Sequence, residues 1–121
     1  MNKNETLMWD IYRFCKKNDL WFDCCVYCNG KAYSSSSEWS GEYGKKIDDE
    51  LYEYENKDPL RYCEYANPKT ITMTFEGPMY RMLNGDVRGW VKLEAQFSKL
   101  FNKYGLYYEM GYAWSLSAYE L

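Results

Sequence analysis

The pair Asn29-Gly30 lies between two extended runs of residues and constrains the fold more than any other feature of this chain. Asparagine followed by glycine favours a two-residue type I′ turn, because both central residues of that turn take positive φ angles. Upstream of the pair, the run from Leu20 to Cys28 alternates between two faces, as a strand does. The turn fixes the register by pairing Cys28 with Lys31, Val26 with Tyr33 and Cys24 with Ser35. The sequence therefore predicts a β-hairpin.

A helix precedes this hairpin and a second clear strand follows it. Apolar residues recur at helical spacing between Asn4, which suits an N-cap, and the pair Asn18-Asp19, which suits a stop. Residues 69–76 alternate between threonine and apolar side chains, which predicts a strand. Its inward face is expected to carry Ile71, Met73 and Phe75, and its outward face Thr70, Thr72 and Thr74.

The remaining part of the chain reads as helix, helix and strand. Pro78 suits the first position of a short helix, and Asp86 suits the N-cap of a longer last helix. Residues 106–119 alternate and predict one long or two short strands. The chain of 121 residues fits a single domain over residues 1–121. We expect an α+β fold, with an antiparallel or mixed sheet of four to five strands and three to four helices packed on it.

The middle of the chain is acidic and rich in tyrosine. Residues 38–64 carry nine carboxylates but four basic residues, whereas the whole chain has a net charge of −3. Tyr43, Ile47, Leu51 and Tyr54 recur at helical spacing, which predicts an amphipathic helix from Lys45 to Glu55; residues 51–55 also read as a strand. The candidate partner-binding residues are Trp39, Glu42, Asp48, Asp49, Tyr52, Glu53 and Glu55.

Composition argues against catalysis and metal binding. The chain has no histidine, which removes the Ser-His-Asp and Cys-His arrangements and the commonest metal ligand. Cys25 and Cys28 form a Cys-x-x-Cys pair with Cys24 next to it, but these residues fall within a strand instead of a turn, and no second such pair exists. We therefore expect a protein that is not an enzyme and that carries no cofactor and no metal.

Charge and hydropathy restrict the partners. Proteins that bind duplex nucleic acid are usually basic, so direct nucleic-acid binding is not expected from a chain with a pI of about 5.0. No apolar run approaches the ~18 residues that a membrane span requires. The chain also begins without the pattern of a secretory signal, so we expect a cytoplasmic protein with reduced thiols.

These observations favour an interaction protein that binds and blocks a basic partner, itself a nucleic-acid-binding protein. Tyrosine suits interfaces, and a row of carboxylates resembles phosphates to a basic groove, as in a DNA mimic. In character the chain is similar to small anti-defence proteins of phages and mobile elements, including those of the anti-CRISPR type. Two alternatives stay open. One is a small-molecule or nucleotide-binding module, with an aromatic pocket from Trp21, Tyr27, Trp90 or Trp114. The other is a self-associating structural protein, such as a homodimer paired through an exposed final strand.

Overall fold

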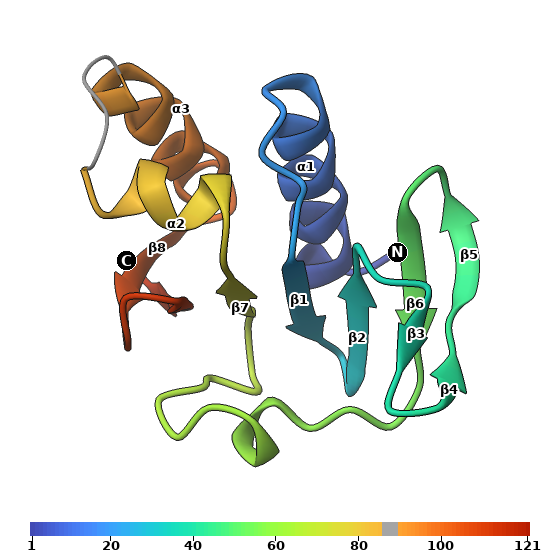
Figure 1. Cartoon of the computed structure of the whole chain (residues 1–121). Coiled ribbons are helices and arrows are strands. Elements are labelled where there is room, and N and C mark those ends of the chain that lie inside the picture. Colours follow the sequence, from blue (N-terminus) through green and yellow to red (C-terminus); the bar gives the residue numbers. More distant parts are fainter. Residues whose placement is uncertain (86–89) are drawn as a thin grey trace.

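Antiparallel strands form the centre of the computed structural model, which describes residues 1–85 and 90–121 (Figure 1). Within these residues, seven strands make one sheet in the order β5-β6-β2-β1-β7-β9-β8. They are β1 (Cys24–Cys28), β2 (Lys31–Ser34), β5 (Lys45–Asp48), β6 (Leu51–Tyr54), β7 (Thr72–Phe75), β8 (Leu106–Met110) and β9 (Ser115–Glu120). A small hairpin pairs β3 (Glu38–Trp39) with β4 (Glu42–Tyr43). The α+β class is confirmed, but the expected four to five strands are too few.

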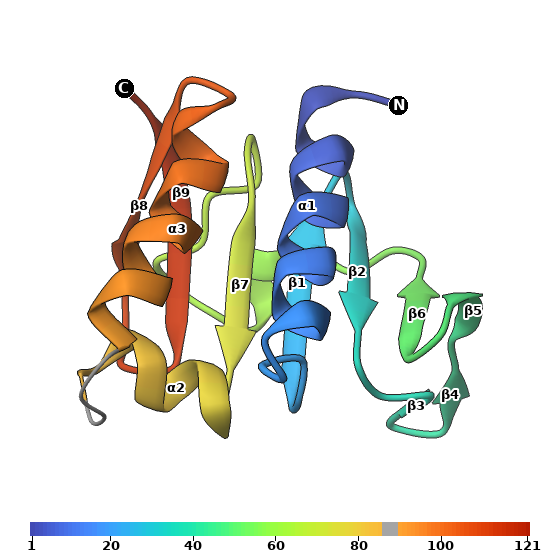
Figure 2. The ribbon, with the colours of Figure 1, turned by 90° about the horizontal axis from the view of Figure 1, so that it is seen from above.

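Three helices of the described residues cover one face of this sheet (Figure 2). They are α1 (Lys3–Lys17), α2 (Pro78–Leu83) and α3 (Trp90–Asn102). Pro78 opens α2, as predicted. The predicted cap of α1 is wrong by two residues: the side chain of Asn2, not Asn4, accepts the Glu5 amide at 2.9 Å. Asn4 instead donates to the Lys69 carbonyl at 3.0 Å. The predicted cap at Asp86 lies outside the described residues.

The hairpin at Asn29-Gly30 is confirmed. Asn29 has φ 56° and Gly30 has φ 76°, the positive values that a type I′ turn requires. Cys28 pairs with Lys31 and Val26 with Tyr33 in the predicted register, and the Ser35 amide donates to the Cys24 carbonyl at 3.0 Å. β1 nevertheless begins at Cys24 and not at Leu20, because Asp23, with φ 51°, leaves the extended conformation.

The hydrophobic core lies between the sheet and the helices. Ile71, directly before β7, and Met73 and Phe75 of β7 are buried there, as predicted, in one cluster with apolar residues of α1 and α3. Phe97 and Phe101 of α3 are fully buried and lie 5.2 Å apart, ring centre to ring centre. The final strand β9 is buried between β7 and β8, so β8 forms that edge of the sheet. Residues 106–119 therefore form two strands, of which β9 is an inner strand and β8 is the one with an open edge.

The predicted helix over residues 45–55 is wrong, because β5 and β6 form a hairpin there. Glu50 has φ 63°, a left-handed conformation that fits a turn and interrupts a helix. Residues 51–54 alternate: Leu51 is buried on the helix side, and Tyr54 is buried on the opposite side. The strand alternative for this stretch is thus the one that forms, because two faces of the sheet need apolar side chains here.

A connecting segment, here called the strap (residues 55–71), covers part of the sheet face that lacks helices (Figure 1). It runs from β6 to β7 and includes the short 3-10 helix η1 (Pro59–Arg61). The strap buries Thr72, whose hydroxyl lies 2.9 Å from that of Ser117 and accepts the Asn67 amide at 2.8 Å. Thr70 is buried as well. Thr72 therefore faces away from the helices, as predicted, but it is covered by the strap, and Thr70 lies within the strap, where its hydroxyl donates to the Ala118 carbonyl at 2.6 Å.

Candidate protein-binding face

Aromatic side chains gather on the sheet face that lacks helices, which we call the tyrosine face. Alternation along the strands and contacts with the strap place them there. They are Tyr27, Trp39, Tyr52, Tyr54, Tyr62, Tyr65, Tyr107, Tyr112, Trp114 and Tyr119. Tyrosine suits this position because its ring packs on the sheet while its hydroxyl reaches water or a polar partner. More than half of the 14 tyrosines in the sequence therefore lie on this one face of the sheet.

The first aromatic cluster is built around Trp39, at the tip of the small β3-β4 hairpin. Its ring centre lies 5.4 Å from that of Tyr54, 6.1 Å from Tyr27 and 5.1 Å from Tyr62. The Lys57 ammonium sits 4.8 Å from the centre of the Trp39 ring and 2.8 Å from a carboxylate oxygen of Glu42. This cation–π contact and ion pair fix the strap to the hairpin. Tyr27 and Tyr54 are buried, so this cluster is mainly structural.

The second aromatic cluster is more exposed. Tyr112 and Trp114 stack with ring centres 4.9 Å apart, and Tyr65 lies 5.2 Å from Tyr112. The Tyr112 hydroxyl donates to Glu64 at 2.5 Å, and this hydrogen bond raises the pKa of Tyr112 to about 12. Trp114 is 37% exposed and Tyr65 is 51% exposed. Ordered, stacked rings with this much exposure are available for contact with another molecule.

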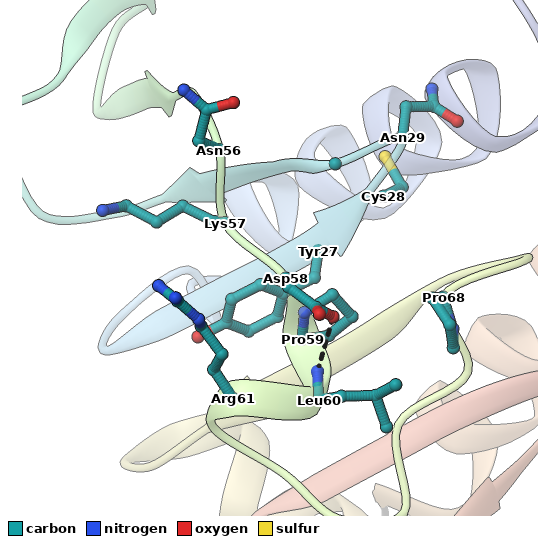
Figure 3. Close-up of a pocket in the computed structure, with 11 residues that line it drawn as sticks. Tyr27, Cys28, Asn29, Asn56, Lys57, Asp58, Pro59, Leu60, Arg61 and Pro68 are labelled. Atoms are coloured by element: carbon teal, nitrogen blue, oxygen red, sulfur yellow. Dashed lines mark hydrogen bonds between the residues drawn. The ribbon is translucent and has the colours of Figure 1, made fainter.

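Cavities open on both sides of Tyr27. One, of about 600 Å³, lies between the Asn29-Gly30 turn and residues 56–61 of the strap (Figure 3). There the Asp58 carboxylate accepts the Leu60 amide at 3.0 Å, and the side chains of Lys57 and Arg61 extend toward the same side of the strap (Figure 3). A second cavity, of about 390 Å³, lies between the two aromatic clusters. It is lined by Asp23, Tyr27, Tyr62, Thr74, Phe75, Glu76 and Trp114.

Comparison with known proteins identifies no relative. No family model matches the chain, and no curated protein or solved structure matches it either. The arrangement of the side chains must therefore carry any functional argument.

The seven predicted site residues do not lie on one surface. Trp39, Glu42 and Tyr52 belong to the tyrosine face or its border, whereas Asp49 and Glu53 face lysines that lie toward the helix side. Lysines pair with most of these carboxylates: Glu42 with Lys57 at 2.8 Å, Asp49 with Lys16 at 3.8 Å, Glu53 with Lys31 at 3.2 Å and Glu55 with Lys31 at 3.4 Å. Asp48 is exposed at the end of β5. These carboxylates therefore do not form a continuous, unpaired row on a helix.

The aromatic pocket considered from the sequence is partly assembled. Tyr27 and Trp114 line the 390 Å³ cavity together. Trp21 is buried elsewhere and donates its indole N–H to the Glu50 carbonyl at 2.7 Å, and Trp90 begins α3 on the helix side. The sequence analysis missed Asp23 and Glu76. Alternation groups Asp23 with Trp21 and Tyr27, but this signal fails at Asp23, where a φ of 51° interrupts the extended run and Trp21 turns to the helix side.

Three of the five cysteines, Cys24, Cys25 and Cys28, are close in sequence but lie on two faces of the sheet. Cys24 and Cys28 point into the core, and Cys25 points to the opposite face, so the three thiols do not converge. Burial raises the pKa of all three to about 12. Across residues 1–85 and 90–121, no group of three Cys, Asp or Glu side chains is placed to hold a metal ion. In the same residues, no helix is both long and apolar enough to cross a bilayer.

Proposed function

We propose that this chain is a non-enzymatic interaction protein that binds and blocks a basic, nucleic-acid-binding protein through its tyrosine face. The observation that carries the proposal is the exposed stack of Tyr65, Tyr112 and Trp114, bordered by carboxylates. Rigid, partly exposed aromatic rings are the side chains that most often dominate binding energy at protein interfaces. The role that we infer is the one expected of a small inhibitor, in character like anti-defence proteins of phages and mobile elements.

Charge favours a basic partner over nucleic acid. Asp23, Glu64 and Glu76 border the exposed rings, while Lys57 on this face is already paired with Glu42. A platform that stacks nucleobases needs a positive groove for the phosphates, which these carboxylates would repel. A basic protein surface, in contrast, would gain in association rate from the same carboxylates. We therefore assign the proposed interface to the tyrosine face and not to the acidic helix expected from the sequence.

The test compares two tyrosines of equal exposure. Tyr112 on the tyrosine face and Tyr80 on α2 are each 37% exposed. The wild type, Tyr112→Ala and Tyr80→Ala are immobilised at equal density, and proteins retained from a lysate of the source organism are quantified by mass spectrometry. We expect one basic protein whose retention falls at least tenfold with Tyr112→Ala and is unchanged with Tyr80→Ala. The purified partner should then lose its nucleic acid when the wild-type chain is added.

Two results would contradict this proposal. Equal retention by both variants would remove the tyrosine face from the interface. A partner that binds its nucleic acid and this chain at the same time would contradict the blocking role. Retention that is insensitive to salt would further argue against electrostatic attraction, because screened charges lose most of their effect above ~0.5 M salt.

A second candidate function rests on the cavity in Figure 3. Its volume of about 600 Å³ is within the range of small-molecule sites, and Arg61 at its rim could contact an anionic group. A nucleotide-binding module would carry its ligand through purification. Native mass spectrometry of the freshly purified chain, with Arg61→Ala as the comparison, tests this: bound nucleotide in the wild type alone would favour it.

A further inference from the structure

The 390 Å³ cavity on the tyrosine face lies where three strand ends meet. The Glu76 amide, just beyond β7, donates to the Asp23 carbonyl, just before β1, at 3.1 Å. The Phe75 amide donates to the Trp114 carbonyl, just before β9, at 2.9 Å. These two backbone hydrogen bonds hold Asp23, Glu76 and Trp114 around one spot. The cavity is therefore built on the sheet framework and not on a loose loop.

The hollow follows from the sizes of the side chains on this face. At its floor, β7 presents Thr74, which pairs with Cys25 of β1 and Ser115 of β9, so three small side chains lie in a row across the sheet. Large rings surround this row. Tyr27 and Tyr62 lie nearly parallel, with centres 5.7 Å apart, and Trp114 closes the other side. Small residues enclosed by large ones leave space that the strap does not fill.

The residues that line this cavity include three aromatic residues, Tyr27, Tyr62 and Trp114, and two acidic residues, Asp23 and Glu76. Within residues 1–85 and 90–121, no ion pair or side-chain hydrogen bond engages the carboxylate of Asp23 or Glu76. Aromatic faces attract cations, and carboxylates attract them more strongly. An anion would be repelled by these two acidic residues, and an apolar side chain would bring no charge to balance them. The cavity therefore has the chemistry of a cation site.

We propose that this cavity receives the side chain of an arginine from the basic partner, with the guanidinium against the rings of Tyr62 and Trp114 and hydrogen-bonded to Asp23 and Glu76. This inference rests on the proposed function, since it names the group by which that partner is recognised. A guanidinium suits the site better than an ammonium, because it is planar, stacks on aromatic rings and donates several hydrogen bonds in one plane.

The cavity can be tested without the partner. N-acetyl-arginine amide is titrated into the ¹⁵N-labelled chain, and the indole N–H signal of Trp114, assigned with Trp114→Phe, is followed by NMR. We expect a saturable shift with a Kd of about 1–10 mM, the range for one solvent-facing side chain. Asp23→Asn with Glu76→Gln should raise that Kd at least about tenfold. The matched double variant Glu94→Gln with Glu120→Gln, which changes the net charge equally on other surfaces, should leave it unchanged.

Several outcomes would overturn the inference. N-acetyl-norleucine amide binding as well as the arginine probe would show an apolar site. N-acetyl-lysine amide binding equally well would remove the guanidinium assignment. An equal effect of the two double variants would show a response to net charge alone. These results leave the proposed function standing, because partner retention by Tyr112→Ala and Tyr80→Ala is measured separately. Conversely, if the two variants retain the partner equally while the arginine probe still binds, the proposed function fails and the cavity assignment stands.

Discussion

Gly44 lies where the small hairpin meets β6, and we expect Gly44→Ala to destabilise the protein. A Cβ atom there would lie 2.7 Å from Cζ and 2.9 Å from Cε2 of Tyr54, and 2.8 Å from Cβ of Tyr52. Neither neighbour can move easily. The Tyr54 ring is buried and its hydroxyl donates to the Ser36 carbonyl at 2.7 Å, while Cβ of Tyr52 moves only with the β6 backbone. The clash must therefore displace the hairpin that carries Trp39.

The size of the effect follows from these contacts. Overpacking costs about 1–3 kcal/mol, and contacts this short against rigid atoms belong at the upper end, near 3 kcal/mol. The melting temperature should fall by about 12 °C in a chain of this length. Gly41→Ala is the matched control, because Gly41 has open space around it but a φ of +84°. Its backbone strain should cost about 1 kcal/mol without moving any ring.

Urea unfolding of both variants, followed by fluorescence, gives the two free energies of unfolding. Near-UV circular dichroism adds a second readout, since Trp39 couples to Tyr27, Tyr54 and Tyr62. We expect Gly44→Ala to alter this spectrum and Gly41→Ala to preserve it. If Gly44→Ala costs no more than Gly41→Ala, or leaves the spectrum intact, the close packing of the hairpin on Tyr54 is refuted.

Three further predictions concern stability. Phe97→Ala should lower the free energy of unfolding in urea by about 3–5 kcal/mol, because it removes a fully buried ring that packs on Phe101 and leaves a cavity. A decrease below about 1 kcal/mol would contradict that packing. Burial raises the pKa of Cys24, Cys25 and Cys28 to about 12 from about 9, so their contribution to stability is complete below pH 9 and is lost as the pH rises toward 12. The urea concentration at the unfolding midpoint should accordingly decrease when the pH is raised from 8 to 10.5. A midpoint that does not change would contradict the burial of these thiols. Treatment with EDTA should leave the melting temperature unchanged; a decrease would reveal a structural metal.

The parts of the fold that short-range chemistry determines could be predicted from the sequence. The Asn29-Gly30 hairpin, the β7 strand and the start of α2 at Pro78 depend on turn geometry, alternation and proline. Residues 45–55 were harder, because their apolar spacing fits a helix and, over residues 51–54, also a strand. What decides between them is tertiary: β6 pairs with β2, and this pairing places Leu51 in one core and Tyr54 in the other. No local pattern contains that information.

The location of the tyrosines explains why the candidate site could be predicted only in part from the sequence. With the described helices on one face, the opposite face of the sheet must be covered by side chains and the strap, and tyrosine can do this while staying in contact with water. That structural need accounts for the buried Tyr27 and Tyr54. It accounts less fully for Trp114, Tyr65 and Tyr112, because these rings keep between 37% and 51% of their surface exposed. Their exposed stacking, next to two acidic residues that folding brings together, is the feature on which the proposed interface rests.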